Sequence, residues 1–434
     1  MAAAGGVPGA QLFQAVQTLF SPTATEVQQR EANSWLEQYA RHPDSWAGCR
    51  AVLEQTWHAA GTVQLAFFIM NLLYQKTRRE ATTLSATVHQ GINNWLGAAA
   101  GAVAQGTLDM HWSVALRLCE TLAALAALQP RGGVSRLLTQ ALSLLSGQPP
   151  KASALRVAVE LLRVLPAEVE QAVVKSVKLR ELRAELGTQL LRVVGVVSTM
   201  LLQQGSPCFL LGSGHVQDPK LCIATLKCVT AWVSVGMSLT TLANAPGNLL
   251  RALMLAIVQC PTVSVVQAIS DTLVGVVTVK TEAQSLAQQQ PGMAVTMVTS
   301  VLGSRKRFSE ASLALAANRY GPGEDVCRAI CALATAVGVA FVDVVARGRE
   351  EVYCRLVDFL SECTACPSRT IAVISQDFWN ALSECPTRNR HPQFCQPLFI
   401  NLLGTLLKQC CFKGELDPGA AATVDFNDDE FGAF

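Results

Sequence analysis

The stretch CTACPSRTIAVISQDFWNALSECPTRNRHPQFC, residues 363–395, can be interpreted as either of two different folds. Its four cysteines, one histidine and CxxC spacing are features of a zinc module, but they also fit a helix pair whose cysteines fill a core. Structural zinc needs a second closely spaced ligand pair, whereas Cys385 and Cys395 stand ten residues apart. The spacing favours the helix pair, and we expect no metal at Cys363, Cys366, Cys385 or Cys395.

The second half of this stretch predicts an amphipathic helix. Ile374, Phe378 and Leu382 recur every four residues, which places them on one face of a helix. The same apolar spacing recurs along most of the chain, for example from Leu182 to Val197. The Val-rich segment 263–279 lacks the alternation of a strand, so we expect a helix there as well.

Short breakers that contain Pro or Gly separate the periodic segments. They are QPRGG (129–133), GQPPK (147–151), LPAE (165–168), NAPGN (244–248), QCP (259–261), QQQPG (288–292) and YGPG (320–323). Each is expected to end one helix before the next begins. Residues 203–219 alone are long enough for an extended loop.

Helix hairpins in series predict an all-α solenoid of HEAT-type antiparallel pairs in a right-handed superhelical array. Such repeats take ~40–47 residues each, so the chain has room for roughly ten of them. The sequence shows no strict period, and two packed all-α globules are the alternative.

Composition narrows the class of protein. Half of the 434 residues are apolar and the formal charge is +2, which gives no basis for a nucleic-acid or membrane surface. The fifteen cysteines are scattered and no early positive charge marks a leader, so we expect reduced thiols in a cytosolic or nuclear protein. The uncharged stretches 228–250 and 252–270 contain breakers and are expected to form core helices rather than membrane spans.

Motifs of catalysis are missing from the sequence. It contains no GxxxxGK[ST], HExxH or GxSxG, and its six histidines are isolated. We therefore expect neither an enzyme nor a cofactor.

Several segments resemble the importin-β (karyopherin-β) family of nuclear transport receptors, in the branch of transportin-three and importin-thirteen. AVISQDFWNALSE resembles a helix near the middle of those receptors, with Phe378 and Trp379 in matching places. Others agree in order: LFQAVQTLF (12–20), REANSWLEQY with Trp35 (30–39), LLRVLPAEV (161–169), LKCVTAWVSVG with Trp232 (226–236), AISDTL (268–273) and NDDEFGAF (427–434).

Two departures accompany this resemblance. The second family repeat carries a Phe-Ala-Ala-Gln-x-Leu/Met-Lys segment, whereas LAFFIMNLLYQK (65–76) has Phe68 and Asn71 in place of its Gln and Lys. Family members are also about twice as long, so we expect the chain to be their N-terminal half.

The resemblance implies a receptor that shuttles between nucleus and cytoplasm and carries protein cargo, such as Ser/Arg-rich splicing factors, under the control of Ran-GTP. In the family the N-terminal repeats bind Ran on a concave face. The segment 64–79 is the place to look, with Asn71, Gln75, Lys76 and Arg78 as candidate contacts. A solvated helix end without function is the competing interpretation of these residues.

The family also binds the Phe-Gly repeats of nuclear pore proteins between its outer helices. Trp232, Phe378 and Trp379 have apolar neighbours at helical spacing, so we expect them, with Trp35, to be structural core residues rather than docking sites.

Three regions follow from this interpretation. Residues 1–110 are importin-β-like N-terminal repeats, residues 111–412 are HEAT-type repeats, and residues 413–434 form an acidic tail or inter-repeat loop with six acids against one lysine. A functional role of this acidic segment toward basic partners, and a HEAT scaffold of another assembly without Ran dependence, remain as alternatives.

Overall fold

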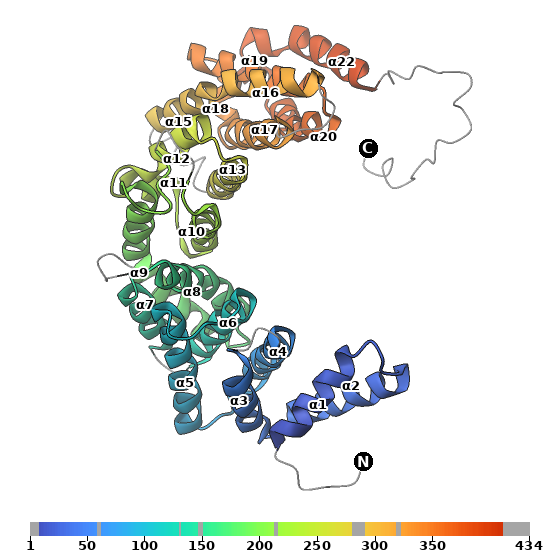
Figure 1. Ribbon diagram of the computed structural model, residues 1–434. Helices are drawn as coiled ribbons and strands as arrows, with labels where there is room; N and C mark the ends of the chain where they lie inside the picture. Colours follow the sequence, from blue (N-terminus) through green and yellow to red (C-terminus); the bar gives the residue numbers. More distant parts are fainter. Residues whose placement is uncertain are drawn as a thin grey trace, which may run out of the picture. The chain divides into compact units, whose positions relative to one another are not determined.

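Every regular element in the described part of the chain is helical (Figure 1). The computed structural model describes residues 8–58, 62–129, 132–145, 151–211, 216–279, 291–317 and 323–410. The all-α prediction is therefore confirmed over these residues. The Val-rich segment forms helix α13, and the uncharged stretches 228–250 and 252–270 divide into short helices as predicted.

The chain divides into two compact units, Met1–Ala283 and Gln284–Phe434. The first contains α1 (Pro8–Phe20), α2 (Glu26–Arg41), α3 (Ser45–Thr56), α4 (Val63–Glu80), α5 (Ala86–Gln105), α6 (Trp112–Leu128), α7 (Gly133–Ser143), α8 (Ala152–Gln171), α9 (Ser176–Leu202), α10 (Pro219–Ala231), α11 (Leu239–Asn244), α12 (Leu249–Gln259) and α13 (Val263–Val277). The second contains α15 (Pro291–Gly303), α16 (Arg305–Ala317), α17 (Gly323–Ala340), α18 (Val342–Arg347), α19 (Glu351–Thr364), α20 (Arg369–Ala372), α21 (Gln376–Glu384) and α22 (Gln396–Cys410).

The expected boundary at 110/111 falls between α5 and α6, which pack on each other inside the first unit. Helices that are consecutive in the sequence pair in this way, as α3 does with α4 and α7 with α8. In addition, α4, α6, α8, α10 and α13 pack one on the next, in that order. The acidic tail 413–434 lies outside the described residues.

Local sequence explains where these helices begin and end. Thr25 starts α2 with a capping box, in which its side chain accepts from the Gln28 backbone N–H. Asp218 caps α10 directly before Pro219, which fits the first turn because it needs no N–H donor there. Gly106 ends α5 with φ +70°, a left-handed conformation that favours glycine.

Helix α6 forms the centre of the first unit. Its sequence LAALAAL, residues 122–128, is buried on all sides, because α4, α5, α7 and α8 surround it. A helix that is apolar all round is expected only in such a buried position.

Helix α8 continues through a residue that was expected to end it. The prediction that LPAE breaks the helix is wrong, since α8 runs through Pro166 to Gln171. Proline lacks an N–H, so the Leu162 carbonyl loses its normal partner. The buried Trp232 indole, at the end of α10, donates to this carbonyl at 2.8 Å and satisfies it.

Cationic side chains repeatedly cap the last carbonyls of neighbouring helices. Lys76 donates to Ala40 O and His42 O at the end of α2, both at 3.0 Å. Lys178 donates to Leu128 O and Gln129 O at the end of α6. Because the C-terminal carbonyls of a helix lack partners and carry partial negative charge, these contacts are favourable.

Helix α9 is long and apolar enough, by length and composition alone, to cross a membrane, and it is the one such helix within the described ranges. In the structure it packs on α7, α8 and α10 through buried residues that include Leu186, Val193 and Val197. That no membrane is involved stays a prediction.

Candidate functional site

Helix α4 carries all four side chains that the sequence proposed as partner contacts. Its apolar face, with Leu65, Ile69 and Leu73, is buried against α3 and α6. Basic residues occupy its last turn, where they complement the helix dipole. The four candidates therefore lie along one helix, but the structure places them in different environments.

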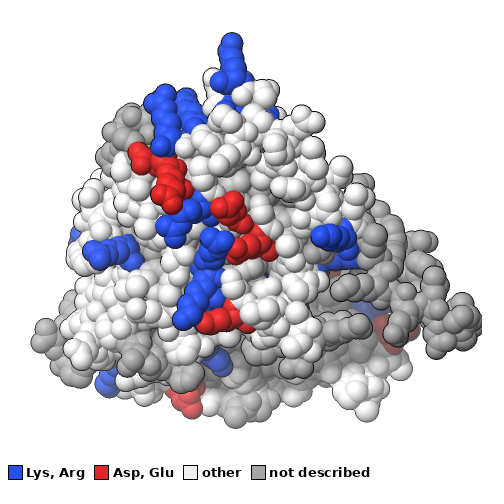
Figure 2. Space-filling view, turned by 90° about the horizontal axis from the view of Figure 1, so that it is seen from above, with Lys and Arg blue, Asp and Glu red and all other residues white. Residues whose placement is uncertain are grey.

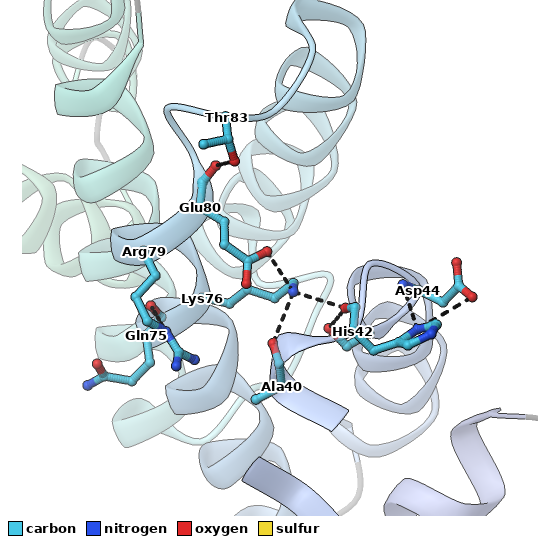
Figure 3. Close-up of polar contacts among 9 residues, drawn as sticks. Ala40, His42, Asp44, Gln75, Lys76, Arg79, Glu80 and Thr83 are labelled. Atoms are coloured by element: carbon cyan, nitrogen blue, oxygen red, sulfur yellow. Dashed lines mark hydrogen bonds and ion pairs between the residues drawn. The ribbon is translucent and has the colours of Figure 1, made fainter. Parts of the chain in front are cut away.

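Lys76 is a structural residue and not an exposed contact. Its side chain is fully buried, and its ammonium makes three short contacts, with Ala40 O, His42 O and, at 2.7 Å, a Glu80 carboxylate oxygen (Figure 3). These three acceptors match the three N–H donors of lysine. The proposal of Lys76 as a Ran contact is thus corrected: no part of its side chain is accessible to a partner.

Gln75 and Arg79 lie on the opposite side of α4 from this ammonium. Figure 3 shows both side chains pointing away from the Lys76 cluster, and both are exposed, while Asn71 is partly exposed one turn earlier. Asn71, Gln75 and Arg79 follow four-residue spacing, so they form one stripe on the helix. Arg79 was missed by the sequence reasoning, although its spacing from Gln75 would have identified it.

Arg78 connects α4 to α8. Its guanidinium donates to Gln171 Oε1 at 2.9 Å, to Gln171 O at 3.2 Å and to Tyr74 Oη at 3.1 Å. Tyr74 in turn donates to a Glu168 carboxylate oxygen at 2.7 Å. Arg78 is therefore partly exposed but already engaged, and a partner would share it with α8.

Burial determines the ionisation of the inner groups of this network. It raises the pKa of the Glu168 carboxyl, against the lowering effects of the Tyr74 hydroxyl and the Arg78 charge. Burial also raises the pKa of Tyr74, and the hydrogen bond to Glu168 adds to this. Burial thus disfavours the charged form of both groups, while the Tyr74 hydroxyl donates to Glu168.

Arg117 of α6 completes this region. Its guanidinium carbon lies 4.8 Å from the Tyr74 ring centre and 5.8 Å from that of Phe67, and it pairs with Glu120 at 2.7 Å. Phe67 is 38% exposed, although it is a large aromatic residue. We define the α4–α6 surface as Phe67, Asn71, Gln75, Arg79 and Arg117. An exposed aromatic ring with flanking polar and cationic groups is chemically suited to binding a protein surface.

The four aromatic residues expected in the core divide into two groups. Trp232, Phe378 and Trp379 are buried, and the Trp379 indole donates to Thr364 Oγ1 at 2.8 Å. Trp35 was also expected in the core, but in the structure it is only half-buried. It stacks on Tyr39, with ring centres 5.0 Å apart. Burial of the first three leaves no ring surface for a Phe-Gly peptide.

The four cysteines of the stretch 363–395 lie at the ends of different helices of the second unit. Cys363 and Cys366 are buried at the end of α19, Cys385 is buried at the end of α21, and Cys395 is partly exposed before α22. Nowhere in the described ranges do three or more His, Cys, Asp or Glu side chains gather in a way that could hold a metal ion.

Charge on the face drawn in Figure 2 is mixed. Basic and acidic side chains interleave along one band, and further basic side chains lie to either side of it within uncharged surface. Such a face lacks the single-signed field that attracts nucleic acid. It is compatible with binding to proteins.

A hollow with a volume of about 1370 Å³ lies between α7, α9 and the connection at 203–207. Leu142, Val196 and Met200 line it together with polar residues that include Arg192 and Gln203. The described lining includes Ser and Thr hydroxyls, but no Asp, Glu, His, Cys or Lys that could act on them as an acid or a base.

Comparison with known protein families finds no family model that matches the chain. A search among curated proteins also finds no match.

Proposed function

We propose that this chain is a nuclear transport receptor of the importin-β type, which carries protein cargo through the nuclear pore under the control of Ran-GTP. In this proposal the helices form a right-handed HEAT-type solenoid, and the α4–α6 surface belongs to the Ran-binding region. Ser/Arg-rich proteins as cargo, Phe-Gly pore proteins as transient partners, and residence in both nucleus and cytoplasm belong to the same proposal.

The observation that carries the proposal is the ordered packing of α4, α6, α8, α10 and α13. In a solenoid, the second helix of each hairpin packs on that of the next and leaves one face open to a partner. The side chains of the α4–α6 surface lie on the first two helices of this row.

The family-like segments support the same conclusion. LLRVLPAEV lies on α8, and LKCVTAWVSVG spans α10 and the turn after it. The hydrogen bond from Trp232 to Leu162 joins these two segments directly. A physical link of this kind gives a reason why the proline and the tryptophan occur together in one sequence.

Nucleotide-dependent capture of Ran tests the proposal. The immobilised chain should retain Ran loaded with a non-hydrolysable GTP analogue and release Ran loaded with GDP. Replacing Gln75 and Arg79 together with Glu should reduce retention several-fold, because it reverses charge on the exposed stripe. Lys76 is left unchanged, since a glutamate there would place a carboxylate against backbone carbonyls in a buried position.

Arg192→Glu serves as the matched control, because it reverses an exposed charge on α9, outside the α4–α6 surface. It should leave retention unchanged. Equal capture of both nucleotide forms, or no capture by protein whose circular dichroism is helical, would refute the Ran proposal.

A HEAT-type scaffold without Ran dependence is the second candidate. The observation in its favour is the burial of Lys76, which removes one of the two cations that the sequence offered for GTPase contacts. If Ran fails to bind, this candidate becomes the leading one.

A further inference from the structure

Helix α22 carries an apolar stripe that the described part of the chain leaves largely open. Ile400, Leu403 and Leu407 recur at spacings of three and four residues, so they share one side of the helix. Their side chains are 59%, 58% and 57% exposed. Within the described ranges no other helix has three large apolar residues more than half exposed. We call these three residues the α22 stripe.

The α22 stripe is not the face by which α22 joins the second unit. Helix α22 packs on α19 and on the short 3-10 turn Pro392–Phe394, and its partly buried residues include Leu398, Leu402 and Leu406. These three leucines lie roughly 130° around the helix from the stripe. Figure 1 shows α22 at the edge of the second unit. A helix that is apolar over so wide an arc is expected to be covered on both sides.

The surface next to the stripe is also open. Gly404 lies one turn after Ile400, and a Cβ built on it would have no atom within 4 Å. The missing side chain lets an incoming group approach the helix backbone closely. A contiguous apolar surface of this kind marks an interaction site, whereas apolar residues exposed singly are ordinary.

The chain itself contains a segment whose chemistry matches this surface. Residues 424–434, VDFNDDEFGAF, lie outside the described residues and combine three aromatic rings, Phe426, Phe431 and Phe434, with four acids. Residues 385–408, which lead into α22 and form most of it, contain three Lys or Arg and no acid. Opposite charges favour the encounter of the two segments, and the rings supply apolar surface to cover the stripe.

The intervening chain is long enough for this contact. Fifteen residues, 411–425, separate the end of α22 from Phe426. A flexible chain of that length has an r.m.s. end-to-end distance of about 20–23 Å. Helix α22 has 15 residues and is therefore about 22 Å long. The rings can thus reach any part of the stripe on the helix that precedes them.

We propose that residues 424–434 fold back onto the α22 stripe of the same chain. The Phe rings cover Ile400, Leu403 and Leu407, and the acids lie toward Lys408, which is exposed on the same helix. A short tether gives the segment an effective concentration in the millimolar range, so even a weak contact is largely formed. A protein that binds either surface must displace the other first.

Photo-crosslinking in the full chain tests this contact. Phe431 is replaced by the photoreactive residue p-benzoylphenylalanine, and the folded protein is irradiated, digested with trypsin and analysed by mass spectrometry. Trypsin cleaves after Arg390, Lys408 and Lys413, so the stripe is released in peptide 391–408 and the probe in peptide 414–434. We expect these two peptides to be linked. Absence of this link in protein with a helical circular dichroism spectrum would overturn the proposal.

Changes in the stripe test its part in the contact. Leu403→Asp together with Leu407→Asp places charge of the same sign as the segment on the stripe, and should lower the yield of the link several-fold. Leu313→Asp is the matched control, because Leu313 is 72% exposed on α16 of the same unit. It should leave the yield unchanged. An unchanged yield in the double variant would show that the stripe is not the docking surface.

Isotope labelling separates contact within one chain from contact between two copies. Unlabelled protein with the photoreactive residue is mixed with an equal amount of ¹⁵N-labelled protein without it, and irradiated. Contact within the chain gives links between two unlabelled peptides only. Links between an unlabelled peptide 414–434 and a labelled peptide 391–408 would overturn the proposal and make a second copy the occupant.

Hydrogen exchange gives a measurement that needs neither the probe nor a change in α22. Replacing Phe426, Phe431 and Phe434 together with Ser should increase deuterium uptake in residues 398–408 several-fold, because the helix loses its cover. Replacing Ala420, Ala421 and Ala422 with Ser is the control and should leave uptake unchanged. If the aspartate variants lose their helical signal, this comparison decides: equal uptake in the parent chain and the Phe variant would mean that residues 424–434 do not cover the stripe.

Discussion

The Leu162 carbonyl shows how one atom can join two distant segments. Pro166 removes its helical donor, and the Trp232 indole supplies another from a residue 70 positions away. A buried acceptor without a partner costs about 1–3 kcal/mol, so the proline depends on the tryptophan.

We therefore predict that Trp232→Phe destabilises the chain by at least that loss of about 1–3 kcal/mol, measured by urea denaturation. In a Pro166→Ala background, the loss of unfolding free energy caused by Trp232→Phe should be about 1 kcal/mol smaller. An alanine at position 166 has an N–H that can donate to the Leu162 carbonyl in place of the indole. Trp379→Phe is the control: it removes an indole donor that serves Thr364, so it should show no coupling to Pro166→Ala. Equal costs of Trp232→Phe in both backgrounds would contradict this account.

The sequence could identify Trp232 as a core residue, because its neighbours are apolar at helical spacing. It could not identify the burial of Lys76, whose neighbours Gln75, Arg78 and Arg79 are those of a solvated helix end. Two of the three acceptors of Lys76 are backbone carbonyls at the end of another helix, and backbone carbonyls leave no mark in a sequence. Trp35 was expected in the core from the family resemblance, but it is only half-buried and stacks on Tyr39.

Helix α17 and helix α21 approach each other closely at a glycine. A Cβ on Gly338 would lie 2.7 Å from Phe378 Cδ2 and 3.2 Å from Leu360 Cδ1. We predict that Gly338→Ala destabilises the chain by about 1–3 kcal/mol, as overpacking does in a filled core. Chemical denaturation measures this change.

Gly101→Ala is the matched control, because Gly101 also lies inside a helix but has no atom within 4 Å of the added Cβ. It should stabilise the chain by about 0.5–1 kcal/mol through helix propensity. The double variant Gly338→Ala, Phe378→Leu should be destabilised by less than the sum of the destabilisations of the two single variants. Strict additivity would mean that the two residues do not compete for space.

Helix α5 carries a buried histidine whose surroundings disfavour its charge. The pKa of His89 is lowered, mainly by burial and further by Arg136 and Lys178, while the Leu125 backbone opposes the shift. The unfolded chain therefore takes up a proton at about pH 6.5, before the folded chain does. Stability from the neutral imidazole is complete above that pH and is lost as the pH falls below it.

We predict that unfolding free energy decreases below pH 6.5 with a His89 contribution of at most about 1.4 kcal/mol per pH unit. His89→Met should remove this contribution, as measured by denaturation at pH 7.5 and pH 5.5. Leu96→Met, a change at a buried apolar residue of the same helix, should preserve it. An unchanged pH dependence in His89→Met would show that other groups cause it.

The order and type of the helices could be predicted well from apolar spacing, because that spacing reflects burial directly. The prediction failed at LPAE, where a contact from α10 overrides the local preference of proline. The sequence offered two packed all-α globules only as an alternative and did not give the boundary after Ala283. That boundary depends on contacts between residues far apart in the sequence, which no local pattern contains.

The cation caps have a consequence for synthesis on the ribosome. Lys76 lies 36 residues after the Ala40 carbonyl that it serves, Lys151 lies 46 after Gln105, and Lys178 lies 50 after Leu128. At ~5–20 residues per second, each of these helix ends emerges about 2–10 s before its cation does. During synthesis the last carbonyls of these three helices therefore depend on water until the following hairpin has emerged, so completion of each helix end lags its translation by about one hairpin.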